Sequence, residues 1–470
     1  MSTATPRRNL WSRAGLFLAA AALALSPLGP SALAGSQPDQ QEAQYSIPVQ
    51  TWRMDNGARV LFVRRTSLPM VSVQVLFDAG SARDPKGKYG LSALTARMLD
   101  QGAGDLSADA FARKVDGLGL DFGASNAHDT LSVQVTSLTR EDTAKKALDL
   151  TAKALMKPTF AKKALARERQ RQLIAIRQDK SDPQTVAVKA FFRAVYGDHP
   201  YAHPTAGVPD QIRKIHRKDL QDFARRYFVG SNATIAVVGN LNRQEAKDLL
   251  AKTLGKLPKG SAPQPLPKVP PVKGPHKIFL KRDVVQANVI MGEPSTRRAG
   301  ADYFPLLVGN YSLGGGGFSS RLMEAIREKE GLAYSVFSTF SGLQRKGPFV
   351  AGLQTANKNI DQALGLLHEE VNHYLAKGPT KDEVKAAQRY LTGSFPLKIS
   401  SNQDIVDQLG TMGFYGLGPG YLADYIPQVR AVDVGSIRKA MDHHLDAKKM
   451  VTVVVGKQRP QGFGKGQAAN

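Results

Sequence analysis

The sequence predicts an α+β protein made of two homologous domains, each a mainly antiparallel sheet with helices on one face. The first observation is a stretch rich in proline and lysine, residues 257–277, where proline recurs without any apolar period; it predicts an extended linker. The second is an internal repeat. The strand-like segment 231–242 resembles 448–458, and the same offset takes 71–77 onto 288–294. A constant offset for two separate pairs indicates a duplicated domain of about 200 residues.

Within the first domain, strand signals come first, helix signals follow, and a strand closes the unit. Segment 51–65 predicts a β-hairpin, because two apolar runs flank the turn signal Asp-Asn-Gly. In segment 90–102, leucine and methionine recur at helical spacing up to a final glycine, which predicts a helix. Segment 131–138 alternates like a half-buried strand, and 147–180 is typical of helices.

The N-terminus predicts a secretory signal peptide over residues 1–34. Three arginines precede an apolar run of about a dozen residues, and Ala32-Leu33-Ala34 supplies a cleavage site of the A-x-A kind. That run is too short to span a membrane, and no other segment approaches 18 unbroken apolar residues. We therefore expect a periplasmic or secreted protein, cleaved near Ala34, without stable membrane insertion. Sec and twin-arginine export both remain open.

The length of the chain also predicts more than one domain. At 470 residues it exceeds the size at which a single hydrophobic core keeps growing. We expect a first domain over 45–256 and a second over 278–457, joined by the linker 257–277.

The composition excludes several classes of function. The chain contains no cysteine, which removes disulfides, thiol catalysis and cysteine-rich metal sites. The formal net charge is +24, and the charges are dispersed. Such charges are typical of a solvated surface and of good solubility. They could also attract acidic peptides, an acidic partner or anionic lipids. Because no basic motif is interleaved with aromatic residues, we expect no binding to nucleic acid.

Segment 87–103, GKYGLSALTARMLDQGA, closely resembles the stretch around the inverted zinc motif H-x-x-E-H of the pitrilysin/insulinase family of metallopeptidases. Ala93 and Arg97 stand where that family has its two histidine ligands, and Ala96 stands where it has the catalytic glutamate. The resemblance covers roughly 45–457. It implies two domains that face each other like a clam shell.

A second segment, 166–183, resembles the one that donates the third zinc ligand in the family. Glu168 matches an acidic position there, but Ala175 replaces the ligand glutamate. A catalytic zinc needs three protein ligands and an open position for the water that it activates. Alanine has no donor atom, and the cationic Arg97 would repel a divalent metal. We therefore expect no metal or other cofactor on this chain, and no peptide hydrolysis by the chain alone.

The second half carries segment 312–338, which resembles the family's substrate-contacting segment. There an arginine and a tyrosine seven residues apart reach toward the zinc site, and here these are Arg327 and Tyr334. A helix capped by serine and ended by Gly331 would hold Tyr334 at the start of a strand. The resemblance implies that the arginine holds substrate carbonyl groups and that the tyrosine donates to the oxyanion. The spacing alone favours a surface arginine and an ordinary strand tyrosine, and only the longer matching segment favours the functional role.

A run of four glycines precedes that helix. Because phenylalanine and serine follow it, the run lacks the G-K-[ST] ending of a phosphate loop. The glycines either allow close approach of a substrate or partner, or form a flexible turn. The residues in question are Gly314, Gly315, Gly316 and Gly317.

Nine histidines offer alternative metal ligands. His199 and His203 form the densest group, but prolines prevent a regular helix there, and the segment matches a structural turn of the family. His443 and His444 are adjacent on a predicted helix, where neighbouring side chains point about 100° apart, and we expect them at the surface.

The resemblance implies two functions. In the first, the chain is the exported, non-catalytic, substrate-binding subunit of a heterodimeric zinc metallopeptidase that degrades peptides. A partner of the same family then brings H-x-x-E-H and the zinc, while Arg327 and Tyr334 orient the peptide. In the second, the chain is a catalytically inactive peptide-binding or scaffold protein of the same fold. An active lone peptidase would require zinc bound to the purified chain. The substrate, the partner's identity and the stoichiometry stay open.

Overall fold

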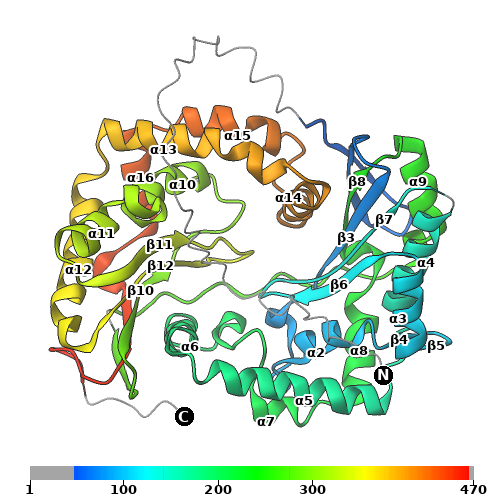
Figure 1. Cartoon of the computed structure of the whole chain (residues 1–470), viewed down its shortest axis with the longest axis horizontal. Helices are drawn as coiled ribbons and strands as arrows, with labels where there is room; N and C mark the ends of the chain where they lie inside the picture. Colours follow the sequence, from blue (N-terminus) through cyan, green and yellow to red (C-terminus); the bar gives the residue numbers. More distant parts are fainter. Residues whose placement is uncertain (1–46, 141, 275, 465–470) are drawn as a thin grey trace, which may run out of the picture.

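The computed structural model describes residues 47–464 apart from 141 and 275, so the expected signal peptide lies outside the described residues. Figure 1 shows two halves, each built on an open sheet, that face each other across the molecule. This mixed architecture of helices and sheets confirms the α+β fold with two similar domains. Among the helices of the described residues, none is long and apolar enough to cross a membrane.

The first half contains a six-stranded sheet and a two-stranded ribbon. The strands are β1 (Gln50–Arg53), β2 (Arg59–Arg64), β3 (Met70–Asp78), β6 (Asp121–Asn126), β7 (Thr130–Leu138) and β8 (Ala233–Gly239), with β4 (Gly102–Ala103) and β5 (Leu106–Ser107) in the ribbon. The order in the sheet is β1-β2-β8-β3-β7-β6, and only β2 and β8 run parallel. β8 is buried along its whole length, as its mainly apolar sequence predicts.

The helices of the first half gather on one face of this sheet, with a single exception. They are α2 (Leu91–Met98), α3 (Ala108–Gly117), α4 (Thr143–Met156), α5 (Lys162–Asp179), α6 (Pro183–Tyr196), α7 (Pro209–Ile212), α8 (Arg217–Tyr227) and α9 (Arg243–Lys252). Helices α2 and α4 pack directly on β7, and α5 and α8 pack on α2. α6 is the exception described below.

The second half repeats the plan with five strands. They are β9 (His276–Lys281), β10 (Gln286–Pro294), β11 (Ala333–Phe340), β12 (Pro348–Ala356) and β13 (Val451–Gly456). The order is β11-β12-β10-β13-β9, with β13 and β9 parallel and the other pairs antiparallel. β10 pairs with β13 as β3 pairs with β8, so the segments of the internal repeat occupy equivalent places in the two sheets.

The helices of the second half, except α14, cover one side of its sheet. They are α10 (Tyr303–Asn310), the π-helix η6 (Tyr311–Gly315), α11 (Arg321–Met323), the π-helix η8 (Glu324–Lys329), α12 (Ile360–Lys377), α13 (Lys381–Gly393), α14 (Asn402–Tyr415), α15 (Tyr421–Arg430) and α16 (Val434–His444). Capping boxes begin α13, α14 and α16, which accounts for their well-defined starts.

One helix of each half covers the sheet of the other half. α14 packs on β2, β3 and β8, while α6 packs on β10 and β13. Leu409 of α14 therefore lies in one buried cluster with Leu61 of β2, and Phe191 of α6 in another with Val453 of β13. Gly413 permits the close approach of α14, because a Cβ there would lie 2.3 Å from Leu61 Cδ1. Each sheet is thus covered on both faces, although its own half supplies the helices on only one.

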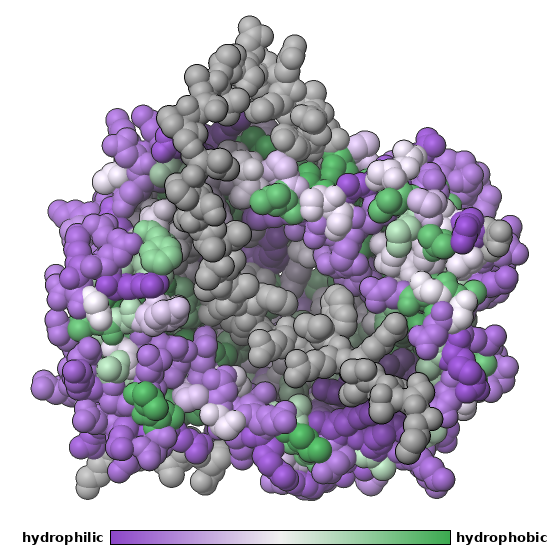
Figure 2. All heavy atoms as spheres, viewed as in Figure 1, coloured by the Kyte–Doolittle hydropathy of each residue, from purple (hydrophilic) through white to green (hydrophobic). Residues whose placement is uncertain are grey.

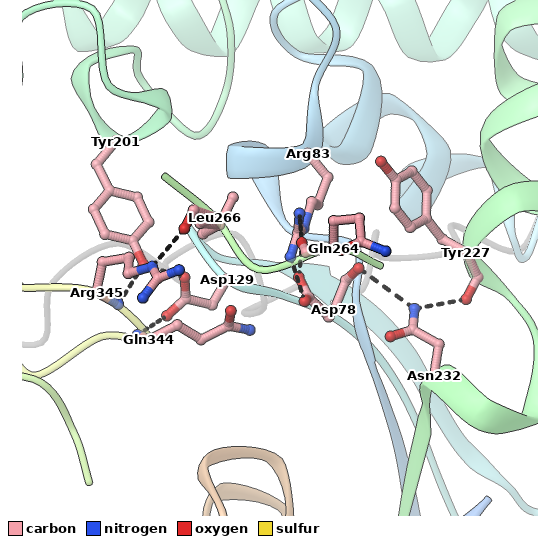
Figure 3. A network of polar contacts seen from close by, with 10 residues as sticks. All are labelled: Asp78, Arg83, Asp129, Tyr201, Tyr227, Asn232, Gln264, Leu266, Gln344 and Arg345. Carbon is pink, nitrogen blue, oxygen red and sulfur yellow. Dashed lines mark hydrogen bonds and ion pairs between the residues drawn. The ribbon is translucent and has the colours of Figure 1, made fainter. Parts of the chain in front are cut away.

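A buried carboxylate, that of Asp129, joins the two halves (Figure 3). It accepts hydrogen bonds from the Tyr201 hydroxyl at 2.6 Å and from the backbone N–H of Gln344 at 2.8 Å. A third comes from the hydroxyl of Tyr415, the last residue of α14, at 3.1 Å. Asp129 and Tyr201 belong to the first half, and Gln344 and Tyr415 to the second. We call these four residues the Asp129 network.

The linker 257–277 is fastened to both halves. Among its described residues, no helix or strand precedes β9, as its sequence predicts. Arg83 of the first half donates to the carbonyl of Gln264 at 2.8 Å, and Arg345 of the second donates to that of Leu266 at 2.6 Å (Figure 3). Because the Leu266 side chain is also buried, the linker is an ordered part of the junction.

Candidate functional site

The three altered positions of the zinc motif lie on one short helix, α2. The carboxylate of Asp84 accepts the N–H of Gly90 at 2.6 Å and fixes the start of this helix. Burial raises the pKa of Asp84 to about 7, against the opposing effect of its backbone donors. Ala93 and Ala96 are buried, and Arg97 is half-buried. The helix therefore presents methyl groups and a guanidinium where the motif would present imidazoles and a carboxylate.

Helix α5, which packs against α2, holds the remaining positions. Glu168 is buried, and its Oε1 lies 2.7 Å from Nη1 of Arg171 and 3.4 Å from Nε of Arg167. Its charge is thus balanced by arginines. Ala175, two turns further along the same face, is half-buried and offers no donor atom. The residue types on α2 and α5 do not fit a zinc ion, which needs three nitrogen, oxygen or sulfur ligands.

The second candidate region is marked by exposed aromatic side chains. Figure 2 shows one face of the molecule as mainly hydrophilic, with its hydrophobic residues scattered. Two of the large hydrophobic side chains exposed among the described residues contact the same arginine. The exposed set consists of Leu68, Ile174, Val285, Phe318, Tyr334, Tyr390 and Leu397.

Arg327 lies between two aromatic rings. Its Cζ is 4.7 Å from the centroid of Phe318 and 5.0 Å from that of Tyr334, within cation–π range of both. Phe318 and Tyr334 are 64% and 74% exposed, so the three side chains form an open surface and not a core. We call them the Arg327 cluster. The structure brings Arg327 and Tyr334 together, as the resemblance implies. Sequence reasoning missed Phe318, although a phenylalanine directly after four glycines was a signal of exposure.

The local backbone differs in part from the expected helix. Gly331 has φ +62° and ends the helical segment in the left-handed conformation, as predicted. The segment itself is one α-turn, α11, followed by the π-helix η8, and not a continuous α-helix. Ser320 precedes it but makes no side-chain cap; its hydroxyl donates to the carbonyl of Gly317 at 2.6 Å. π-Helical turns are frequent at functional sites.

Three of the four glycines are required by packing inside the protein. A Cβ at Gly314 would lie 2.6 Å from the backbone N of Ser338, on β11. Gly315 and Gly316 are similarly close to Asn310 and Tyr311. Gly317 has φ +58° and open space around it, and it lies directly before Phe318. The run therefore holds Phe318 beside β11. Tyr334, near the start of β11, supplies the other ring of the Arg327 cluster.

Comparisons with known proteins identify the family to which the chain is similar. A family model described as insulinase (peptidase family M16) matches residues 59–208, and one described as the peptidase M16 inactive domain matches 214–391. A solved structure, a peptidase M16 inactive domain from Pseudomonas fluorescens, is 36% identical and superposes with a TM-score of 0.84. The match covers 89% of this chain and 100% of that one. This chain belongs to the insulinase family, peptidase family M16.

Relatives within family M16 differ in how they are named. A non-peptidase homolog, YmxG, from Helicobacter pylori is 26% identical over 405 residues, which is 85% of this chain and 92% of the relative. An uncharacterized zinc protease from Rickettsia bellii is 23% identical over 417 residues, or 87% and 98%. A solved protease from Helicobacter pylori, with a TM-score of 0.80 at 23% identity over 87% of this chain and all of that one, supports the fold alone.

Membership of family M16 confirms the resemblance inferred from the sequence. Since Ala93, Arg97 and Ala175 stand at the ligand positions, this chain is an M16 homologue that lacks the residues of the zinc centre. The inactive-domain descriptions of its relatives agree with a non-catalytic chain.

The histidines occupy two different environments. His199 accepts the N–H of Tyr201 at 3.2 Å on Nδ1, and its Nε2 lies 3.1 Å from the Pro267 carbonyl, so it holds a turn against the linker. His443 is exposed, as predicted. The surface prediction is wrong for His444, whose side chain is only 12% exposed, because the ring turns inward at the end of α16.

Proposed function

We propose that this chain is the non-catalytic, substrate-binding subunit of a two-chain zinc peptidase of family M16. The observation that supports the proposal is a contrast between the halves. The zinc positions on α2 and α5 have lost their donor atoms, while the half-buried Arg327 lies beside the exposed rings of Tyr334 and Phe318. A partner of the same family then supplies H-x-x-E-H and the zinc, and this chain supplies groups that hold the peptide.

The chemistry of the Arg327 cluster suits an extended peptide. The guanidinium can donate to two carbonyl oxygens, and the aromatic rings on either side restrict its orientation. The Tyr334 hydroxyl can donate to an oxygen that becomes negative during hydrolysis. Gly317, with open space around it, leaves room for the peptide backbone beside Phe318. Acidic peptides are favoured by the formal net charge of +24.

The test is reconstitution with an M16 subunit that carries an intact H-x-x-E-H motif, assayed on unfolded fluorogenic peptides. We expect Tyr334→Phe to lower kcat by about 100-fold, the effect of one lost oxyanion donor of ~2.7–4 kcal/mol. We expect Arg327→Ala to act mainly on KM, because it removes a contact to the bound peptide.

Matched controls separate this role from general damage. Tyr390→Phe makes the same change at another exposed tyrosine, and Arg113→Ala makes the matching change at an exposed arginine of α3. Both should leave kcat and KM within twofold of the unaltered mixture. If the mixture cleaves no faster than the zinc subunit alone, or if all four variants behave alike, the proposal is wrong.

The second candidate is a peptide-binding or scaffold protein without any role in hydrolysis. The name of the Helicobacter pylori relative, a non-peptidase homolog, favours this function. It predicts that the isolated chain binds a labelled peptide, measured by fluorescence anisotropy, with no gain in hydrolysis from any M16 partner. Arg327→Ala would weaken that binding too, so the reconstituted rate decides between the two candidates.

We also propose that the protein is exported and acts in the periplasm or outside the cell. The support is the sequence of residues 1–34, with its basic start, apolar run and A-x-A site. The mass of the mature protein, recovered from the periplasmic fraction, should correspond to a chain that begins at Gly35. A mature protein that retains Met1 and stays in the cytoplasm would contradict export.

A further inference from the structure

Three potential metal ligands converge at the junction of α10 and α16. Asp302, directly before α10, lies with its Oδ2 3.0 Å from Nδ1 of His443 and 2.9 Å from Nε2 of His444. One donor atom from each of the three side chains lies within 4.8 Å of the others. In the part of the chain that the structure describes, this is the one such group of three or more. It lies in the second half, while the altered zinc positions lie on α2 and α5 of the first (Figure 1).

The end of α16 explains how two adjacent histidines reach one point. On a continuing helix their side chains would diverge by about 100°. Here α16 ends at His444, and the next residue, Leu445, is already extended. The centroids of the two rings nevertheless lie 4.5 Å apart, because the side chains bend toward each other at this end of the helix. The free carbonyl groups at a helix C-terminus also favour a cation.

The contact between His444 and the carbonyl of Ser295 decides which ring nitrogen of His444 carries the proton. Its Nδ1 lies 3.3 Å from the backbone carbonyl of Ser295, which can only accept a hydrogen bond. Nδ1 therefore carries the proton, and in the neutral ring Nε2 has a lone pair. That lone pair points at an oxygen of Asp302, 2.9 Å away, and two lone pairs repel unless a positive charge lies between them. The charge is either a proton, carried by the ring or by the carboxyl group, or a metal ion.

We propose that Asp302, His443 and His444 bind a divalent ion of the Zn²⁺ type. Two imidazole nitrogens and one carboxylate oxygen form a ligand set that suits this ion. The bond from His444 to a backbone carbonyl is the outer contact that metal-binding histidines usually make. His443 is 71% exposed, so water can complete the coordination sphere. The ion would join the start of α10 to the end of α16, and the site does not depend on the function proposed above.

The test uses the full chain without a histidine tag, freed of metal with a chelator and titrated with ZnSO₄ in a calorimeter. We expect one zinc per chain. Asp302→Asn, which keeps the shape of the side chain, and His444→Ala should each weaken binding at least tenfold. His373→Ala removes an exposed histidine from α12 and should change nothing.

A spectroscopic measurement gives an independent readout. Co²⁺ added to the metal-free chain should produce visible absorption that is absent in Asp302→Asn, in His443→Ala and in His444→Ala. Circular dichroism checks that each variant is folded, and since the three variants change different side chains, one that fails to fold does not end the test. Equal zinc affinity in all variants, or no binding to the unaltered chain below millimolar zinc, would show that the positive charge is a proton and overturn the proposal.

Discussion

The Asp129 network makes a quantitative prediction about how firmly the two halves are joined. Asp129→Ala removes the acceptor for three donors: the buried hydroxyl of Tyr201, and the partly buried hydroxyl of Tyr415 and N–H of Gln344. Each donor left without a partner costs about 1–3 kcal/mol. Burial raises the pKa of Asp129, so the carboxylate itself is costly to bury and its removal returns part of that sum. We expect a loss of about 4 kcal/mol in the free energy of unfolding.

Asp129→Asn should cost much less. Its amide keeps one oxygen acceptor, and its NH₂ group can donate to a tyrosine hydroxyl, which accepts as well as donates. We expect about 1 kcal/mol, the net value of one ordinary hydrogen bond. Tyr415→Phe should cost about the same, and it should cost nothing further in the background of Asp129→Ala, because its partner is already gone.

Urea unfolding with two probes measures these effects. In a chain that begins at Gly35, Trp52 is the only tryptophan, so its fluorescence reports on the first half, while far-UV circular dichroism reports on both. Asp129→Ala should lower both midpoints. Asp121→Ala removes an exposed carboxylate from β6 and serves as the control, with an expected change below ~0.5 kcal/mol. A loss no larger for Asp129→Ala than for Asp121→Ala, or equal losses for the alanine and asparagine variants, would refute the reasoning.

Two further predictions concern pH and packing. Burial raises the pKa of Glu293 from 4.5 to about 7. Between these two pH values the carboxyl group is ionised in the unfolded chain but still protonated in the folded one. The free energy of unfolding therefore falls as pH rises, by about 3 kcal/mol in total. Glu293→Gln keeps the acceptor for the N–H of Asp446 and should remove this part of the pH dependence of stability. Thermal unfolding at pH 5 and pH 8 measures the pH dependence, and an equal change in the variant and the unaltered chain would contradict the prediction. Gly314→Ala should lower stability by ~1–3 kcal/mol, because its Cβ meets the backbone of β11. Gly365→Ala, within α12 and with nothing near its Cβ, should raise it by up to ~1 kcal/mol, and a loss there equal to that at Gly314 would contradict the packing argument.

Much of the fold could be predicted because its signals are local. The mainly apolar runs of β8 and β13, the helical spacing in α2 and the glycine at 331 each specify their own conformation. The internal repeat added the one long-range inference, that the two halves share a plan. The proximity of Arg327 and Tyr334 followed from the same kind of signal, since one helical segment and one strand start separate them.

The parts that could not be predicted depend on contacts between distant segments. Periodicity shows that α6 and α14 each have an apolar face, but not that the face belongs to the opposite sheet. The pairing of Asp302 with His443 and His444 joins residues far apart in the chain, and no sequence motif marks Asp302, which lies directly before α10. The π-helix η8 depends on how the segment packs, and no residue in it is a recognised signal for that form.

The exchange of α6 and α14 between the halves restricts how far the two halves can move apart. Opening the shell about a hinge would pull Leu409 and Met412 from one sheet and Phe191 and Phe192 from the other. With their neighbours on the same helices, about seven large apolar side chains would meet water, at ~1.5 kcal/mol or more each. That total of about 10 kcal/mol equals the whole stability of a typical domain. The packing of α6 and α14 on opposite sheets therefore resists any hinge opening of the two halves.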